Sequence, residues 1–169
     1  YIVLKKNYNT VCNYIQHSGI QNYVIKLSGL AGGKGVFLPN TKEEAFKTIN
    51  DIYINNVYGD NKDIIIEERL YGEEVSVMGF CNGNEIFLLP QSQDFKRLSD
   101  NNNGPNTGGM GAYTPANVLN NEELDSLKNY MDLIVKDLNY VGILYAGVMR
   151  ATTSKTSQYN ILEFNCRFG

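Results

Sequence analysis

Hydrophobic and polar side chains alternate along this chain at two periods, one typical of helices and one typical of strands. Apolar residues recur at helical spacing over residues 42–55 and again over 124–138, which predicts two amphipathic helices. Thr41 and Glu44 carry the signature of a capping box at the start of the first. A shorter helix is expected with Thr10 as its cap.

Extended segments rich in β-branched and aromatic residues predict strands. The turn signal Asn82-Gly83 joins two of them as a hairpin. Residues 93–117 contain few apolar side chains, and a loop of this length in a compact domain needs a functional reason. Because hairpins and crossing helices mix without regular βαβ alternation, the pattern predicts an α+β fold. The expected strands are 23–27, 36–38, 63–69, 74–81, 85–92, 142–150 and 158–164.

The composition narrows the class of protein. The 169 residues include 43% hydrophobic side chains and carry a net charge of -3, so the chain can build a core but lacks a broad basic surface for nucleic acid. Three scattered cysteines do not have the spacing of a disulfide framework or a zinc site. No apolar run approaches the ~18 residues that span a bilayer, and the start does not resemble a signal peptide. We therefore expect a cytoplasmic globular protein that binds neither nucleic acid nor membrane.

A glycine-rich segment at residues 28–35 places four glycines and Lys34 between two predicted strands. Glycines let backbone N–H groups approach an anion closely, and an ammonium group neutralises part of a triphosphate's charge. Lys26, on the preceding strand, supplies a second cation. The spacing is not that of a Walker A loop, because Lys34 is followed by glycine. A phosphate-binding loop and a flexible hairpin loop both remain open from this segment alone.

An acidic segment follows the predicted strand at 63–69. A chain leaving a strand can pair its backbone with an adenine edge, and a nearby carboxylate can accept hydrogen bonds from ribose hydroxyls. Glu74 is the candidate for the ribose contact. A solvated acidic turn is the alternative.

Near the end of the chain, strand alternation sends Glu163, Asn165 and Arg167 to one face and Leu162 and Phe164 to the other. A carboxylate and an amide oxygen at neighbouring positions can bind Mg²⁺, which leaves coordination positions for phosphate oxygens. The guanidinium group of Arg167 would then contact a phosphate directly. The alternative is the polar edge of a half-exposed strand.

The long segment at 93–117 begins with Asp94, Lys96 and Arg97 and continues into a glycine-rich run. The adjacent cations suit a phosphorylated substrate, and backbone N–H groups of residues 106–109 could complete an anion-binding nest. A purely structural loop is the alternative. His17, the only histidine, lies outside these motifs, which disfavours a histidine-dependent triad.

Together, four segments resemble the phosphoribosylamine–glycine ligase (glycinamide ribonucleotide synthetase) family, from about Tyr23 to Gly169. The segments are residues 24–36, 92–97, 104–113 and 163–169, of which the third is the most specific. Members of this family have the ATP-grasp fold, in which two α+β lobes hold ATP between them. The resemblance implies a lead-in helix and linker at 1–22, a smaller lobe at 23–70 and a larger lobe at 71–169.

The resemblance also implies a role for each motif. Lys34 and Arg167 would act as catalytic cations on the reacting phosphate, and Glu163 and Asn165 would bind Mg²⁺ or Mn²⁺. ATP would be bound by Lys26, Gly32, Gly33, Lys34, Gly35, Glu67, Glu68, Leu70 and Glu74. The substrates glycine and 5-phosphoribosylamine would face Asp94, Lys96, Arg97, Asn106, Thr107, Gly108 and Gly109.

The reaction implied by the resemblance joins glycine to 5-phosphoribosylamine, with conversion of ATP to ADP and phosphate through a glycyl phosphate in purine biosynthesis. Many ATP-grasp enzymes carry a second metal-binding acid on the strand before the Glu-Asn strand, but residues 144–149 offer none, which leaves the metal stoichiometry open. The family's flanking domains are not in this sequence, so we do not expect the chain alone to turn over. The sequence leaves open whether the same polypeptide carries further purine-pathway domains. Two alternative functions also stay open: another ATP-grasp ligase or carboxylase, and a non-catalytic nucleotide-binding module.

Overall fold

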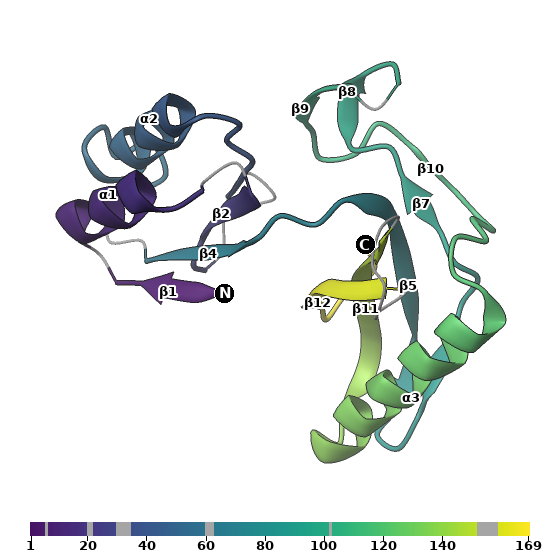
Figure 1. Cartoon of the computed structure of the whole chain (residues 1–169). Helices are drawn as coiled ribbons and strands as arrows, with labels where there is room; N and C mark the ends of the chain where they lie inside the picture. Colours follow the sequence, from purple (N-terminus) through teal and green to yellow (C-terminus); the bar gives the residue numbers. More distant parts are fainter. Residues whose placement is uncertain (6, 20–21, 30–34, 60–62, 102, 152–158) are drawn as a thin grey trace. The chain divides into compact units, whose positions relative to one another are not determined.

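The computed structural model describes residues 1–5, 7–19, 22–29, 35–59, 63–101, 103–151 and 159–169. The chain divides into two compact units, Tyr1–Arg69 and Leu70–Gly169, and Figure 1 labels their helices and most of their strands. The first unit packs two helices and the second unit packs one against an antiparallel sheet, so the predicted α+β class is confirmed. Among the described residues, no helix is both long and apolar enough to cross a membrane.

The first unit is a four-stranded sheet with two helices on one face (Figure 1). The strand order is β1-β4-β2-β3, and neighbouring strands are antiparallel. Its core joins Ile25 and Ile66 of the sheet to Ile15 and Ile49 of the two helices, and all four side chains are buried. The elements are β1 (Ile2–Leu4), α1 (Tyr8–His17), β2 (Tyr23–Leu27), β3 (Val36–Phe37), α2 (Lys42–Tyr53) and β4 (Ile64–Glu68).

Polar caps fix where α1 and α2 begin. Asn7 caps α1 by accepting a hydrogen bond from the Thr10 N–H at 3.0 Å, so Thr10 lies inside the helix and does not cap it as predicted. Thr41 caps α2 through its hydroxyl, which accepts from the Glu44 N–H at 3.2 Å. The Glu44 carboxylate accepts from the Asn40 N–H at 2.7 Å, so the reciprocal half of the predicted capping box is displaced by one residue.

The N-terminal residues form part of the first unit's core. The sequence predicts a lead-in helix and linker at 1–22, but the structure adds β1, which pairs with β4 and buries Leu4. Val11 of α1 is also fully buried in this core. A three-residue strand is too short to show a readable alternation, which is why the sequence did not predict β1.

The second unit has a four-stranded sheet, ordered β12-β11-β5-β6, with α3 covering one face (Figure 1). Val75 and Val148 of the sheet pack with Leu127 and Met131 of the helix in a buried core. Gly83 has φ +90° in the turn between β5 and β6, and the predicted hairpin is confirmed. The elements are β5 (Gly72–Asn82), β6 (Ile86–Leu88), α3 (Asn121–Asp137), β11 (Val141–Ala151) and β12 (Tyr159–Asn165). The predicted turn at 152–157 lies outside the described residues.

The predicted long loop at 93–117 is not a single loop. β7 (Gln93–Asp94) pairs with β10 (Ala112–Tyr113), and β8 (Arg97–Ser99) pairs with β9 (Asn103–Asn106). Strands of two to four residues carry too little alternation to be read from the sequence. In its described residues the segment is therefore held by two pairs of antiparallel strands.

Gln91 attaches the end of this segment to the second unit. Its buried side-chain amide accepts a hydrogen bond from the Leu119 N–H and donates one to the Leu119 carbonyl, both at 2.8 Å. Its own backbone carbonyl accepts from the Ala116 N–H and from the Thr114 hydroxyl, both at 2.9 Å. A single side chain thus supplies the pairing that a neighbouring strand would otherwise give to a buried backbone.

Replacing Gln91 with methionine is expected to lower the free energy of unfolding by about 2–4 kcal/mol, because the buried N–H and carbonyl of Leu119 both lose their partner. Urea-induced unfolding of the protein measures the change. Gln16→Met, at an exposed position of α1, is the matched control and should stay within about 0.5 kcal/mol. Equal midpoints for the two variants would show that Gln91 does not hold this segment.

Candidate active site

The sheet face of the second unit that points away from α3 gathers polar side chains. Residues 75 and 77 of β5 pack in the core beside α3, so the side chains at 74 and 76 point to the opposite face. The same alternation on β11 buries residues 146 and 148 and turns residues 145 and 147 outward. We call this surface the polar face, and it comprises Glu74, Ser76, Tyr145, Gly147, Glu163 and Asn165.

A β-bulge in β12 directs Glu163 to the polar face. Ile161 pairs with Val148 and packs against the core, whereas Glu163 pairs with Gly147, so Leu162 is an extra residue between these two pairs. In a regular strand, residues two apart share a face, and Glu163 would have pointed to the side of α3. The bulge reverses that direction, as bulges beside functional sites commonly do.

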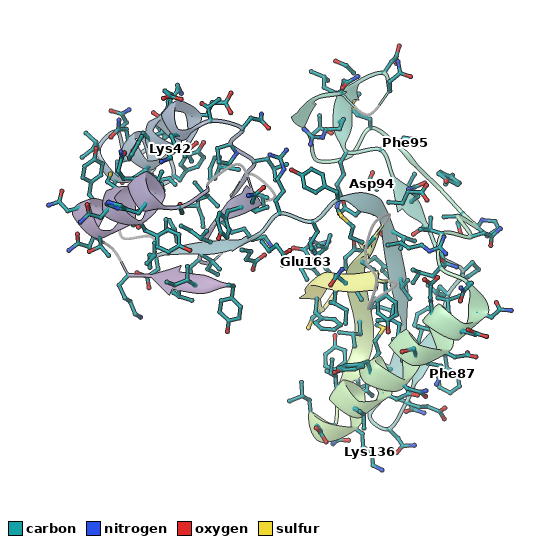
Figure 2. All side chains as sticks on the ribbon, viewed as in Figure 1. Lys42, Phe87, Asp94, Phe95, Lys136 and Glu163 are labelled. Carbon is teal, nitrogen blue, oxygen red and sulfur yellow. The ribbon has the colours of Figure 1, made fainter. Side chains whose placement is uncertain are left out.

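Glu163 and Asn165 are in direct contact, with the Asn165 Nδ2 donating to Glu163 Oε1 at 3.1 Å. Figure 2 shows Glu163 on β12. A carboxylate and an amide oxygen fit a hard divalent ion such as Mg²⁺, which keeps other positions for phosphate oxygens and water. Within the described ranges, no three His, Cys, Asp or Glu side chains gather as a metal site. An ion here would therefore take most of its coordination from a ligand and water.

Arg167 lies beyond the end of β12, which stops at Asn165. The strand alternation that was expected to place Arg167 beside Glu163 does not extend that far. Its guanidinium group donates to the Phe168 carbonyl at 2.8 Å.

Lys96 reaches the polar face from the segment between β7 and β8. Its Nζ lies 2.6 Å from Glu74 Oε1, and the two side chains are 35% and 41% exposed. Burial lowers the pKa of Lys96, but the hydrogen bond and charge of Glu74, helped by Tyr145 and Asp94, outweigh burial and raise the pKa above its ordinary value. Glu74, which was predicted to bind the ribose, and Lys96, which was predicted to bind a substrate, thus form an ion pair with each other.

A small polar hollow lies at this ion pair. It is lined by Glu74, Val75, Ser76, Asp94 and Lys96, which come from β5 and from the segment that starts at β7. Figure 2 shows Asp94 on β7. The hollow brings two groups of sequence-predicted residues together within one unit.

Sequence reasoning missed Tyr145 and Ser76. Their hydroxyl groups lie 3.0 Å apart, and both side chains are buried. The only available signal was a hydroxyl-bearing residue between two apolar neighbours in each of two strands. A single serine or tyrosine in a strand is too common a feature to single out these two.

Hydrogen bonds through the backbone and the Thr107 hydroxyl hold the segment that is predicted to face the substrates. The Lys96 carbonyl accepts from the Thr107 N–H at 2.6 Å and from its hydroxyl at 2.9 Å, and the Gly109 N–H donates to Thr107 Oγ1 at 3.0 Å. Two N–H groups of the predicted anion nest are therefore engaged. Gly109 has φ +118°, and a Cβ there would lie 3.2 Å from Asp94 Oδ1, so the close approach of Asp94 favours glycine.

The β8–β9 hairpin carries two more predicted substrate residues. Arg97 and Asn106 are register partners, and the Arg97 guanidinium donates to the Gly104 carbonyl at 2.8 Å. Gly108, just after the hairpin, has open space where a Cβ would stand. The hairpin thus holds Arg97 through its backbone and leaves room beside Gly108.

The first unit joins two of the predicted nucleotide residues in an ion pair between Lys26 and Glu67. Ile25 and Leu27 point to the helices, so Lys26 lies on the opposite face of the sheet. Glu68, at the end of β4, is exposed.

Only part of the glycine-rich segment is described. The Gly35 carbonyl accepts from the Leu27 N–H at 2.8 Å, and Gly35 is buried. The predictions for Gly32, Gly33 and Lys34 fall outside the described residues. Leu70 opens the second unit, so the predicted nucleotide residues are divided between the two units.

Solved structures share this fold. The chain aligns with the phosphoribosylamine–glycine ligase of Thermotoga maritima at a TM-score of 0.81 and 32% identity, over 99% of this chain and 43% of that one. D-alanyl-alanine synthetase A of Vibrio cholerae gives a TM-score of 0.71 at 10% identity, over 98% and 49%. The biotin carboxylase domain of Hydrogenobacter thermophilus 2-oxoglutarate carboxylase, solved with ADP, its magnesium salt and bicarbonate, gives 0.69 at 13%, over 98% and 35%. The last two identities are low enough to show the fold alone.

The fold defines an ATP-grasp domain, as the sequence predicted. Residues 2–169 match the family model described as phosphoribosylglycinamide synthetase, ATP-grasp (A) domain, and the chain belongs to this family. The trifunctional purine biosynthetic protein adenosine-3 of Gallus gallus is 42% identical over 165 residues, which cover 94% of this chain and 16% of the relative. The phosphoribosylamine–glycine ligase of Leptospira interrogans is 40% identical over 169 residues, 96% of this chain and 39% of the relative. The chain thus spans less than half the length of either relative.

Proposed function

We propose that the chain is the nucleotide-binding part of an ADP-forming ligase that joins glycine to 5-phosphoribosylamine. ATP phosphorylates the glycine carboxylate, and the amine of phosphoribosylamine captures the glycyl phosphate to give glycinamide ribonucleotide, ADP and phosphate. The observation that carries the proposal is the family match over residues 2–169, with 40% and 41% identity to two phosphoribosylamine–glycine ligases.

In this proposal, the polar face acts by position and charge and forms no covalent bond to substrate. Glu163 and Asn165 hold Mg²⁺ or Mn²⁺, which neutralises phosphoryl charge when bound. Lys96 contributes a positive charge on the same face once a ligand competes for Glu74. The family model that matches residues 2–169 is described as an ATP-grasp domain, which supports the choice of nucleotide.

The remaining roles follow the sequence motifs. Lys34 and Arg167 act on the reacting phosphate, and Glu74 takes the ribose. The other phosphates are bound by Lys26 and Gly32 to Gly35. The adenine is bound by Glu67, Glu68 and Leu70. Glycine and phosphoribosylamine are bound by Asp94, Lys96, Arg97 and Asn106 to Gly109.

The full-length protein is expected to form ADP only when glycine, phosphoribosylamine and Mg²⁺ are all present. The amine must be there to capture the acyl phosphate, and the metal must be there to neutralise charge on the transferred group. A coupled ADP assay with each component omitted in turn measures this. Equal ATP hydrolysis without glycine would contradict the assignment, and ADP formation with alanine but not glycine would indicate a different ATP-grasp ligase.

We further infer that the full-length protein is cytoplasmic and carries additional purine-pathway domains. The three cysteines are free thiols, which suits a reducing compartment. Relatives named as trifunctional and bifunctional purine biosynthetic proteins support the additional domains. The mass of the native polypeptide tests this, and a mass no greater than that of a single-activity ligase would contradict it.

A further inference from the structure

Tyr145 is a buried tyrosine on the polar face. Only 5% of it is exposed, and its hydroxyl lies 3.0 Å from the Ser76 hydroxyl, which is itself buried. Ser76 also lines the hollow that contains Glu74 and Lys96. The phenol is thus fixed at one end by a hydrogen bond to the strand next to its own.

Gly147 leaves a space that Tyr145 and Glu163 approach from two sides. A Cβ at Gly147 would lie 3.3 Å from Glu163 Cγ, 3.5 Å from Tyr145 Cε1 and 3.6 Å from the Tyr145 hydroxyl oxygen. The aromatic edge and the carbon that carries the carboxylate therefore border the same space. A Cβ at this position would press on Glu163 Cγ and come into van der Waals contact with the Tyr145 ring.

The tyrosine ring is also held on its other edge. A Cβ at Gly169 would overlap Tyr145 Cε2, so the ring lies directly against that glycine. Tyr145 is in addition the register partner of Asn165, the residue that contacts Glu163. The ring is therefore restrained by Ser76 and Gly169, whereas Glu163 is an exposed side chain on a bulged strand.

We propose that Tyr145 is a positioning residue for the divalent-metal site, in which its ring, anchored through its hydroxyl to Ser76, sets the direction of the Glu163 side chain over Gly147. The inference rests on the proposed function for the role of Glu163 and Asn165 as metal ligands. An exposed glutamate loses considerable rotamer freedom when it is fixed. A ring that already limits that freedom makes the carboxylate a better ligand, as outer partners of metal ligands do elsewhere.

The test is Mn²⁺ binding to the full-length protein with saturating ADP, read from the electron paramagnetic resonance signal of free Mn²⁺. Tyr145→Phe keeps the ring but loses the anchor, and it is expected to weaken Mn²⁺ binding about tenfold. Tyr159→Phe is the matched control, because its hydroxyl also bonds a serine, Ser126, at 3.0 Å but on the α3 side of the sheet. That variant should bind Mn²⁺ as the wild type does.

A second variant separates positioning from folding. Tyr145→Phe leaves the Ser76 hydroxyl unpartnered and lowers stability, whereas the double variant Tyr145→Phe/Ser76→Ala removes both partners and restores most of it. Mn²⁺ binding should remain about tenfold weak in the double variant. Recovery of Mn²⁺ binding together with stability, or unchanged binding in Tyr145→Phe, would overturn the inference. Intact Mn²⁺ binding in a wild type that forms no ADP with glycine and phosphoribosylamine would refute the proposed function alone.

Discussion

Replacing Glu163 with glutamine is expected to lower Mg²⁺-dependent ADP formation at least about tenfold, or about 1.4 kcal/mol of activation free energy. The substitution keeps the shape of the side chain and removes the charge that attracts the ion. The Asn165 contact at 3.1 Å can persist with an amide in place of the carboxylate, so the fold should be retained. Initial rates measured across a Mg²⁺ series should show a higher half-saturating concentration as well as a lower maximum.

Glu122→Gln is the control for this substitution. It removes the same charge from the same unit, at an exposed position in the first turn of α3 on the other side of the sheet. Its rates should follow those of the wild type. If Glu163→Gln kept the wild-type metal dependence, Glu163 would not belong to the metal site.

Replacing Lys96 with methionine is expected to reduce kcat/KM for ATP about a hundredfold, or about 2.7 kcal/mol. The substitution keeps much of the aliphatic stem and removes the ammonium group that bonds Glu74 at the polar hollow. Glu74 is then left without its cation beside a polyanionic ligand, which it repels. Steady-state kinetics of ADP formation with saturating glycine and phosphoribosylamine measures the loss.

Lys128→Met is the control for Lys96. Lys128 pairs with Asp132 at 2.7 Å and is 33% exposed, against 2.6 Å and 35% for Lys96, but it lies on α3.

Adding Glu74→Gln completes a double-mutant cycle, and a coupling of about 0.5–3 kcal/mol is expected for residues in direct contact. Additive effects would show that the two side chains act separately, and a wild-type kcat/KM in Lys96→Met would remove Lys96 from the site.

The charge on Lys96 should not limit activity near neutral pH. Because its pKa is raised above the ordinary value near 10.5 by Glu74, the stabilising contribution of the ion pair is fully present below that ordinary value. It is lost only as pH rises through the raised pKa. Any activity change between pH 6 and 8 should therefore be the same in Lys96→Met and in the wild type.

Most regular elements were readable from the sequence because their periods were long enough. The helices α2 and α3 each show several turns of apolar spacing, and β5 and β11 are each eleven residues long with runs of apolar side chains. The short elements were not predicted, because they contain too few residues to show a period. β1 and the strands within residues 93–113 are too brief to repeat a pattern, so their backbone partners become known only in three dimensions.

Some residues of the candidate site were likewise identified from the sequence and others were not. Glu163 and Asn165 were identifiable because a carboxylate and an amide two residues apart form a recognisable ligand pair. The roles of Gln91, Ser76 and Tyr145 were not identifiable, because each depends on a hydrogen-bond partner that is distant in the sequence. Gln91 and Leu119 are 28 residues apart, and Ser76 and Tyr145 are 69 residues apart.

The sequence by itself determined the α+β class, the main helices and strands, and the types of charged residue available for a nucleotide and a metal. Local spacing and side-chain chemistry carry that information. Only the tertiary structure decided the direction of Glu163, because the bulge at Leu162 depends on the pairing of β12 with β11. It also decided the pairing of Lys96 with Glu74 and of Tyr145 with Ser76, since contacts between distant segments are set by how the strands assemble.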